Sequence, residues 1–372
     1  MNNYFKSIES QINNSKKIAF CITCMNRLDH LKQTLEMNIL ENYQTEHVEF
    51  ILLDYNSQDG LGEWVYSNMK NYIDEGILVY YRTVEPAYYQ RSHSRNMAFR
   101  LANAEILCNL DADNFLGKGF ASFMLQEFAT HESIFYVTNY SPDGTFGRIC
   151  IRNEDFISIK GYNEALQGWG FEDNDIQNRL IEKGLKSMHF QNHEFYHYIK
   201  HSDLERISEE YLYKKLYLMY ITYINPYTSE ILLLYNNNVT EKYTLVNNRR
   251  LNVLIEESDI NESLLSDSKR IIIEDIIRGS WKEEGDKIYI KENKKIFPFD
   301  KDTSSFDLNG KTYFSIPQNN AIKTKIIMQL TFSINYNEAV KQMKNKSEIN
   351  ADGFGRGVVF KNFNRTNKII LI

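Results

Sequence analysis

Residues 106–113 of this 372-residue chain read Ile-Leu-Cys-Asn-Leu-Asp-Ala-Asp, an apolar run followed at once by two carboxylates. The run Ile106–Leu110 predicts a buried strand, with Asp111 and Asp113 at its carboxyl end. Ligands of an open α/β sheet bind at that edge. Two carboxylates that face the same way repel each other unless a hard cation joins them, so the pair indicates a metal-bound, phosphate-containing substrate. A plain polar turn after a strand is the alternative.

Strand and helix patterns alternate around this stretch. Apolar runs predict strands at 18–22, 48–53, 77–81 and 105–110. Helical spacing of apolar residues predicts helices at 28–39 and 94–104. This alternation favours a mostly parallel, doubly wound α/β sheet. Further strands and helices between 120 and 183 predict a second half-sheet that serves the same site.

The later part of the chain has a different pattern. A tyrosine-rich amphipathic helix is predicted at about 203–224, for packing, a dimer surface or membrane anchoring. From Val246 onward, short alternating runs predict a small β-rich domain without a catalytic motif. We therefore expect two domains, 1–240 with the chemistry and 246–372 appended to it. We expect the second to be dispensable for the chemistry.

Composition narrows the class of protein. The net charge of −6 provides no broad basic field, which argues against nucleic acid as a partner. Four cysteines make no disulfide framework in a chain this long, and Cys21 and Cys24 face opposite sides of a predicted strand, as core residues rather than a metal or redox pair. No run reaches the roughly 18 apolar residues of a membrane span, so we expect a cytoplasmic protein.

Five motifs follow one another in an order that identifies a family resemblance. They are Ile18–Arg27, Leu53–Gly60, Ser94–Asn96, Leu110–Asp113 and Gly168–Asp173. Together they resemble the GT-A glycosyltransferases of family two, and the Trp-Gly-x-Glu-Asp segment is similar to the β-1,4-galactosyltransferase and chondroitin-polymerase branch. The resemblance spans about Lys17–Arg206. It implies a GT-A (Rossmann-like) mixed sheet and transfer of a sugar from a nucleotide to a hydroxyl group.

The donor site is predicted at the strand ends. Asp54 ends a buried strand, where its carboxylate can accept a hydrogen bond from a uracil N–H or a ribose hydroxyl. Arg27 follows the first strand, where its forked cation can hold diphosphate oxygens, unless it is an ordinary surface arginine. The resemblance implies that Arg95 and Asn96 clamp the phosphate or sugar of the donor, and that Asp111 contacts its ribose or sugar. Thr23 is a further predicted donor-binding residue.

The resemblance also implies a metal site for Mn²⁺ or Mg²⁺. Asp113 is its direct ligand, and the cation neutralises the leaving diphosphate. A histidine after the Glu-Asp helix supplies a further ligand. His197 matches that position best, and His201 is the alternative, because the two imidazoles would share one face of a helix.

Carboxylates crowd the start of a predicted helix at Glu172–Asp175. Crowding raises the pKa of an acid, which suits a general base. The resemblance implies that Asp173 is the catalytic base, and that Glu172, Trp169 and Gly170 bind the acceptor. The alternatives are a helix cap and a core tryptophan. Phe171 stands where the branch has a second glycine, so acceptor identity does not carry over.

These motifs predict an inverting, metal-dependent glycosyltransferase. The expected donor is a UDP-sugar, with galactose or an N-acetylhexosamine as the sugar, and the expected acceptor is a hydroxyl of a glycan or other molecule, in bacterial polysaccharide or glycan synthesis. A retaining enzyme on the same fold and a non-catalytic sugar- or nucleotide-binding protein are the alternatives. Peripheral contact with the inner face of a membrane and homo-oligomerisation stay open.

Overall fold

The computed structural model describes residues 16–43, 47–138, 144–225, 228–246, 272–316 and 320–372. These residues belong to two compact units. The first unit comprises the ranges Met1–Gln167, Phe171–His201 and Lys346–Ile372. The second comprises Gly168–Gly170 and Ser202–Asn345. The chain therefore passes through the second unit and returns to the first for its last 27 residues.

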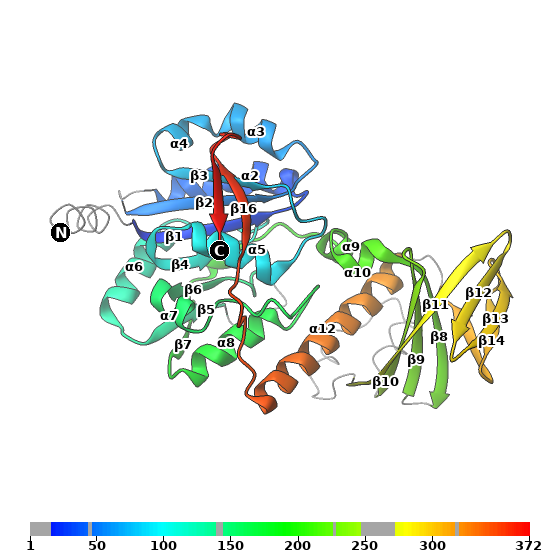
Figure 1. Ribbon diagram of the computed structural model, residues 1–372. Coiled ribbons are helices and arrows are strands. Elements are labelled where there is room, and N and C mark those ends of the chain that lie inside the picture. Colours follow the sequence, from blue (N-terminus) through cyan, green and yellow to red (C-terminus); the bar gives the residue numbers. More distant parts are fainter. Residues whose placement is uncertain (1–15, 44–46, 139–143, 226–227, 247–271, 317–319) are drawn as a thin grey trace. The chain divides into compact units, whose positions relative to one another are not determined.

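A nine-stranded mixed sheet organises the described part of the first unit, in the order β17-β16-β3-β2-β1-β4-β6-β5-β7. Its strands are β1 (Lys16–Cys24), β2 (Val48–Tyr55), β3 (Leu78–Thr83), β4 (Ala104–Asn109), β5 (Ile134–Val137), β6 (Ile149–Arg152), β7 (Lys186–His189), β16 (Gly357–Lys361) and β17 (Lys368–Leu371). Strands β3, β2, β1 and β4 are parallel, whereas β6 runs antiparallel to both β4 and β5. The predicted doubly wound mixed α/β sheet is confirmed (Figure 1).

Helices connect these strands. They are α2 (Leu28–Asn42), α3 (Leu61–Asn68), α4 (Lys70–Asp74), α5 (Arg91–Leu101), α6 (Phe120–Thr130), α7 (Asn153–Ser158), α8 (Glu172–Glu182) and the short 3₁₀ helix η1 (His193–Tyr196). The predicted helices at 28–39 and 94–104 correspond to α2 and α5. Helix α8 begins at Glu172, so the clustered carboxylates occupy its first turn.

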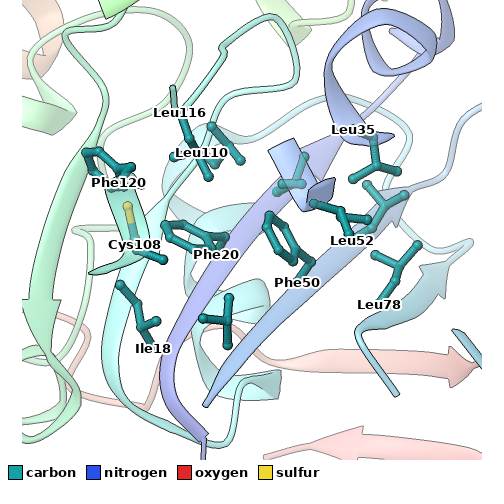
Figure 2. Packing of buried hydrophobic residues seen from close by; sticks show 14 of the residues in the cluster. Ile18, Phe20, Leu35, Phe50, Leu52, Leu78, Cys108, Leu110, Leu116 and Phe120 are labelled. Carbon is teal, nitrogen blue, oxygen red and sulfur yellow. The ribbon is translucent and has the colours of Figure 1, made fainter. Parts of the chain in front are cut away.

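Alternation along the central strands divides the core between two faces of the sheet. Phe20 packs on one face with Phe50 and Phe120, and Figure 2 shows these rings beside Leu110 and Leu116. Side chains of the alternate positions, including Ala19 and Cys21, pack on the other face. All four cysteines are buried and free, so the prediction that Cys21 and Cys24 are core residues is confirmed. Burying each aromatic ring contributes about 1.5–3 kcal/mol.

The last residues of the chain form part of the first sheet. Strand β16 pairs antiparallel with β3, with Phe360 opposite Arg82 (Figure 1, red). The Arg100 guanidinium donates to the carbonyl oxygens of Phe354, at 2.5 Å, and of Ile372, at 2.7 Å. The prediction that 246–372 is one appended domain is therefore wrong for residues 346–372. The alternating run at 357–360 predicts a strand but not the sheet that the strand joins.

The second unit contains an antiparallel sheet in the order β13-β12-β11-β10-β9-β8-β15-β14. Its described strands are β8 (Leu216–Asn225), β9 (Thr228–Tyr235), β10 (Val239–Val246), β11 (Ile272–Glu284), β12 (Lys287–Glu292), β13 (Lys295–Asp300), β14 (Ser305–Leu308) and β15 (Lys311–Ser315). Ile231 and Leu233 pack on one face with helix α12 (Asn320–Asn345), and Leu232 and Leu234 pack on the other. The predicted β-rich part is confirmed, although it begins before Val246.

The helix predicted at 203–224 is wrong beyond residue 215. Helices α9 (Asp203–Ile207) and α10 (Tyr211–Lys215) are short, and β8 follows directly. The sequence of β8, Leu-Tyr-Leu-Met-Tyr-Ile-Thr-Tyr-Ile-Asn, is rich in aromatic and β-branched residues, whose strand preference outweighs the helical spacing of its apolar positions. Among the described helices, none combines the length and apolar character needed to cross a bilayer.

Strand β16 offers a test of the role of the C-terminal residues. Val359 is fully buried in the core of the first unit, whereas Ile370 on β17 is 65% exposed. We expect Val359→Ala to lower the free energy of unfolding by about 2 kcal/mol, because two buried methyl groups are lost. Ile370→Ala should change it by less than about 0.5 kcal/mol. Urea unfolding of both variants checks this, and equal effects would show that residues 346–372 do not belong to the core.

Candidate active site

Asp113 and His201 meet beyond the carboxyl end of β4. Asp113 Oδ2 lies 2.7 Å from His201 Nε2, and Asp113 Oδ1 accepts a hydrogen bond from the Asn114 side chain at 3.1 Å. The backbone N–H of Ile199 donates to the carbonyl oxygen of Asp113 at 2.7 Å. The chain leading to His201 is thereby held against the chain that follows β4.

His201, the alternative of the two predicted histidines, is the one that contacts Asp113. His197 is exposed, and its carbonyl oxygen accepts a hydrogen bond from Phe115 N at 2.9 Å. Residues 197–201 are not helical: Asn114 and Tyr198 form an antiparallel bridge. The helix assumed for the pairing of the two imidazoles is therefore wrong, and the metal-ligand role of either histidine stays a prediction.

Positive charge surrounds this carboxylate. Burial alone would raise the pKa of Asp113, but the hydrogen bond and charge of His201, with the charge of Arg27, hold that pKa below its usual range. Arg27 Nη1 lies 3.3 Å from Nδ1 of His30, whose ring centroid is 5.5 Å from that of His201. Arg27 thus lies beside the Asp113 end of the site, as predicted for a residue that holds diphosphate. His30 was not predicted.

Asp113 and His201 could supply only part of the ligand set of a divalent cation. In the described ranges, no group of three or more His, Cys, Asp or Glu side chains is arranged to hold a metal ion. A carboxylate and an imidazole nevertheless converge at Asp113 and His201. Mg²⁺ in phosphate-transfer sites is typically held by one or two protein ligands and completed by substrate oxygens and water. The pair is compatible with that arrangement.

A second cluster of charges surrounds Arg95 on α5. Its guanidinium is 3% exposed and lies 2.8 Å from Asp173 Oδ1, 3.3 Å from Asp111 Oδ1 and 3.6 Å from Glu172 Oε1. Burial lowers the pKa of Arg95, but the three carboxylates override this and hold it well above its ordinary value. Arg95 therefore joins the carboxyl end of β4 to the first turn of α8.

Asp173 has the properties expected of a general base near neutral pH. Burial, followed by the charges of Glu172 and Asp111, raises the pKa of Asp173 to about 7, although Arg95 opposes the shift. An acid of that pKa is ionised in part at neutral pH and can accept a proton from a sugar hydroxyl. Glu172 is also buried, and its Oε2 atom has no hydrogen-bond partner within the described ranges. This orphaned acceptor suits contact with a substrate hydroxyl.

Gly147 is a site residue that the sequence reasoning missed. A Cβ atom there would lie 2.8 Å from Arg95 Nη2, 2.9 Å from Asp111 Oδ2 and 3.5 Å from Asp173 Oδ2. Arg95, Asp111 and Asp173 approach the backbone here this closely because the residue has no side chain. A glycine two residues before β6, the strand next to β4, is the only signal in the sequence, and it does not by itself indicate a site.

Adding a side chain at residue 147 should disturb the site more than the fold. We expect Gly147→Ala to lower kcat/KM at least about 10-fold, because the new methyl group displaces Arg95 or Asp111 from its ion pair. The unfolding midpoint should change little, since the neighbouring atoms are ends of side chains that can move. Steady-state kinetics and urea unfolding measure the two quantities. An unchanged kcat/KM would mean that the ion pairs of Arg95 are not needed for turnover.

Asp54 is predicted to bind the donor, and the structure shows it engaged by its own chain. It is fully buried and accepts hydrogen bonds from Tyr80 Oη and Ser57 N, both at 2.7 Å. Arg82 Nε lies 3.6 Å from the same carboxylate. At the end of β1, Thr23 Oγ1 lies 2.7 Å from Tyr89 Oη. Each carboxylate oxygen of Asp54 thus already accepts one hydrogen bond within the chain, and its donor-binding role stays a prediction.

Asn96 is likewise occupied within the protein. Its amide donates to the carbonyl oxygen of Tyr162 at 2.8 Å and to Glu164 Oε1 at 2.7 Å, and its Oδ1 accepts from Tyr162 N at 2.7 Å. Glu164 Oε1 also accepts from the backbone N–H of Gly355. Asn96 therefore ties the loop at 161–164 to α5, and indirectly supports its neighbour Arg95. Its predicted role as a clamp on the donor stays a prediction.

The predicted acceptor residues are divided between the two units. Trp169 and Gly170 belong to the second unit, where their carbonyl oxygens accept from Thr331 Oγ1 at 2.8 Å and Asn335 Nδ2 at 2.7 Å. The Trp169 ring centroid lies 6.4 Å from that of Phe332. This packing on α12 agrees with the core alternative for Trp169, and its sugar-stacking role stays a prediction.

Phe171 has a backbone conformation that favours glycine. It precedes α8 with φ 73°, in the left-handed region, and is largely buried. A residue with a Cβ atom adopts that region at a cost of about 1–2 kcal/mol. The glycine that the galactosyltransferase branch carries at this position would adopt it freely. Phenylalanine in place of this glycine therefore leaves the turn intact and places a buried ring next to Glu172.

Comparison with protein families finds a match that includes much of this site. Residues 133–202 match the family described as the N-terminal domain of galactosyltransferase. A 54-residue stretch is 35% identical to chondroitin sulfate synthase 3 of Homo sapiens and, equally, of Mus musculus. That stretch is 14% of this chain and 6% of each curated relative. The predicted resemblance to glycosyltransferases is confirmed for this segment.

Several solved structures resemble about half of the chain. A mannosyltransferase of Pyrobaculum calidifontis is 15% identical with a TM-score of 0.40, covering 50% of this chain and 61% of its own. For TarS of S. aureus the identity is 13%, the TM-score 0.42 and the coverage 51% and 61%. For β1,4-galactosyltransferase 7 of Drosophila the values are 14%, 0.37, 52% and 74%. Because these TM-scores are low, the fold assignment rests on the chain's own topology.

Proposed function

We propose that this chain is an inverting, metal-dependent glycosyltransferase that moves a sugar from a UDP-sugar to an acceptor hydroxyl. The observation that carries the proposal is the cluster around Arg95. It brings the raised-pKa carboxyl of Asp173 and the strand-end carboxylate Asp111 onto one guanidinium, at 2.8 Å and 3.3 Å. Asp113 follows Asp111 by two residues in the chain.

Asp113 and His201 would hold Mn²⁺ or Mg²⁺ at the donor end of this site. Their 2.7 Å separation and their chemistry, one carboxylate and one imidazole, support that role. When bound, the cation would supply charge neutralisation for a leaving diphosphate. Arg27, which acts electrostatically on Asp113, would hold diphosphate oxygens as a forked cation.

Asp173 would take the proton from the acceptor hydroxyl. Its pKa of about 7 matches the requirement for a base at neutral pH, and Arg95 fixes one of its oxygens. Glu172, with its unpaired Oε2 atom, would orient the acceptor by accepting a hydrogen bond. Gly147, which has no side chain, would let Arg95 and Asp111 keep their positions against the backbone.

The substrate classes are proposed from the matched segment. The galactosyltransferase model and the chondroitin sulfate synthase relatives support galactose or an N-acetylhexosamine as the transferred sugar. They also support a glycan acceptor and a role in polysaccharide or glycan synthesis. For the second unit we propose a role in acceptor engagement, because it contains Trp169 and Gly170, for which the family resemblance implies acceptor binding.

Donor turnover and product stereochemistry test the proposal together. The purified chain is incubated with Mn²⁺, a UDP-sugar panel and candidate glycan acceptors, and UDP release is followed beside NMR analysis of the product. We expect metal-dependent UDP release and a β-linked product from an α-linked donor. An α-linked product would identify a retaining enzyme on the same site. Binding of UDP without any turnover would instead support a non-catalytic binding protein.

A further inference from the structure

Arg148 is a buried cation that the proposed chemistry does not use. It directly precedes β6, its side chain is fully buried, and within the described ranges it has no ion pair with a carboxylate. Burying a charged group is costly unless hydrogen bonds replace its contacts with water. A guanidinium in such a place is therefore expected to have a specific task, and its hydrogen bonds show what it holds.

The fork of Arg148 joins the two chain segments that carry Asp113 and His201. On one side its Nη2 atom donates to Asn114 Oδ1 at 3.1 Å and to the carbonyl oxygen of Phe115 at 2.8 Å. On the other side Nη1 donates to the carbonyl oxygen of Phe195, six residues before His201. A planar fork can bridge these acceptors, whereas the point charge of a lysine cannot reproduce its geometry.

Asn114 transmits this clamp to Asp113. Because its Oδ1 atom accepts from Arg148, its amide nitrogen faces the other way and donates to Asp113 Oδ1 at 3.1 Å and to the Gly144 carbonyl oxygen at 3.2 Å. That hydrogen bond occupies one carboxylate oxygen of Asp113 and leaves Oδ2 facing His201. The orientation of the carboxylate thus follows from the position of the guanidinium.

We propose that Arg148 is a positioning residue that holds Asp113 and His201 in register for a divalent cation. The proposal rests on the proposed function, since it assumes that this pair binds the metal. Arg148 donates to Phe195, Asn114 and Phe115, so it would act on the pair through these residues. Loss of hydrogen bonds that orient the metal ligands commonly lowers metal affinity about 10- to 100-fold.

Arg152, the last residue of β6, provides a control. Its guanidinium also donates to backbone carbonyl oxygens, those of Phe128 at 2.5 Å and His131 at 3.3 Å, and it lies 5.3 Å from the Phe128 ring centroid. Arg148 lies in the same way 5.5 Å from the Phe120 ring centroid. Both arginines therefore have a carbonyl-bound fork and an aromatic neighbour, but Arg152 donates to Phe128 and His131 and, within the described ranges, not to Asp113, Asn114 or His201.

The test measures Mn²⁺ binding to the full chain by electron paramagnetic resonance, without nucleotide, and kcat over a range of Mn²⁺ concentrations. We expect Arg148→Lys to weaken Mn²⁺ binding at least about 10-fold, while kcat at saturating Mn²⁺ stays within about 3-fold of the unmodified protein. Arg152→Lys should bind Mn²⁺ normally. Unchanged Mn²⁺ affinity in Arg148→Lys, or an equal loss in Arg152→Lys, would overturn the proposal.

A second variant keeps the proposal testable if Arg148→Lys does not fold, which urea unfolding would show. Asn114→Leu removes the relay while keeping the arginine, and the same loss of Mn²⁺ affinity is expected; normal affinity would overturn the proposal. Failure of the unmodified chain to bind Mn²⁺ would overturn the metal pair of the proposed function as well. Metal binding that survives in both variants would overturn the role of Arg148 alone.

Discussion

Replacing Asp173 by asparagine should lower kcat by at least about 10²-fold while leaving donor binding nearly unchanged. The amide has the shape of the carboxylate but cannot accept the proton of the attacking hydroxyl. Arg95 would keep two of its three carboxylate neighbours, Asp111 and Glu172, so the site should remain assembled. Single-turnover kinetics with the UDP-sugar and acceptor, beside UDP binding, separate the two effects. If kcat is untouched, the base lies elsewhere.

The same residue sets the expected dependence on pH. Because the pKa of Asp173 is raised to about 7, the residue is protonated below that pH and cannot act as a base. The value of kcat/KM should therefore rise with pH and level off above about 7. The matched control is Asp175→Asn. Asp175 lies on the same helix with its pKa raised by burial, but it pairs with Arg179 at 2.7 Å. In Asp175→Asn, kcat/KM should still fall below about pH 7. Loss of this fall in Asp175→Asn would mean that Asp173 is not the base.

Replacing Asp113 by alanine should reduce turnover at least about 10³-fold and abolish metal-stimulated UDP binding. The variant removes the carboxylate that converges on His201, while the strand that precedes it stays buried. Isothermal titration with UDP, with and without Mn²⁺, measures the binding. As a control, Asp155→Ala removes a carboxylate paired with Lys183 outside the site and should leave both quantities unchanged. Full activity of the unmodified chain in EDTA would contradict the assignment.

The sequence predicted the first unit well because its signals are local. Apolar runs with the right length identify β1, β2 and β4, and parallel strands must place their carboxyl ends at one edge. The two aspartates after β4 and the acidic start of α8 are therefore recognisable without a structure. The meeting of Asp111 and Asp173 at Arg95 depends on the helix that carries this arginine, which the spacing of Met97 and Leu101 also predicts.

Long-range pairings were missed because no local pattern encodes them. Strand β16 is predicted as a strand, but its pairing with β3 links residues that are far apart in sequence. The prediction that includes His201 assumes a helix over residues 197–201. That segment is instead held by backbone hydrogen bonds to the chain after β4. The roles of Gly147 and Arg148 depend on their neighbours in the fold. Gly147 matters because it has no side chain, and Arg148 because its guanidinium is buried.

Metal-dependent donor turnover by the full chain is the most direct test of the proposed glycosyltransferase activity. UDP release from UDP-galactose and from UDP-N-acetylhexosamines is measured with Mn²⁺ and with EDTA, in the presence of a glycan acceptor. The proposed site predicts UDP release with Mn²⁺ from at least one of these donors, its loss in EDTA, and its loss in Asp113→Ala. UDP release that is equal in Mn²⁺, in EDTA and in Asp113→Ala would contradict the proposed metal-dependent transfer.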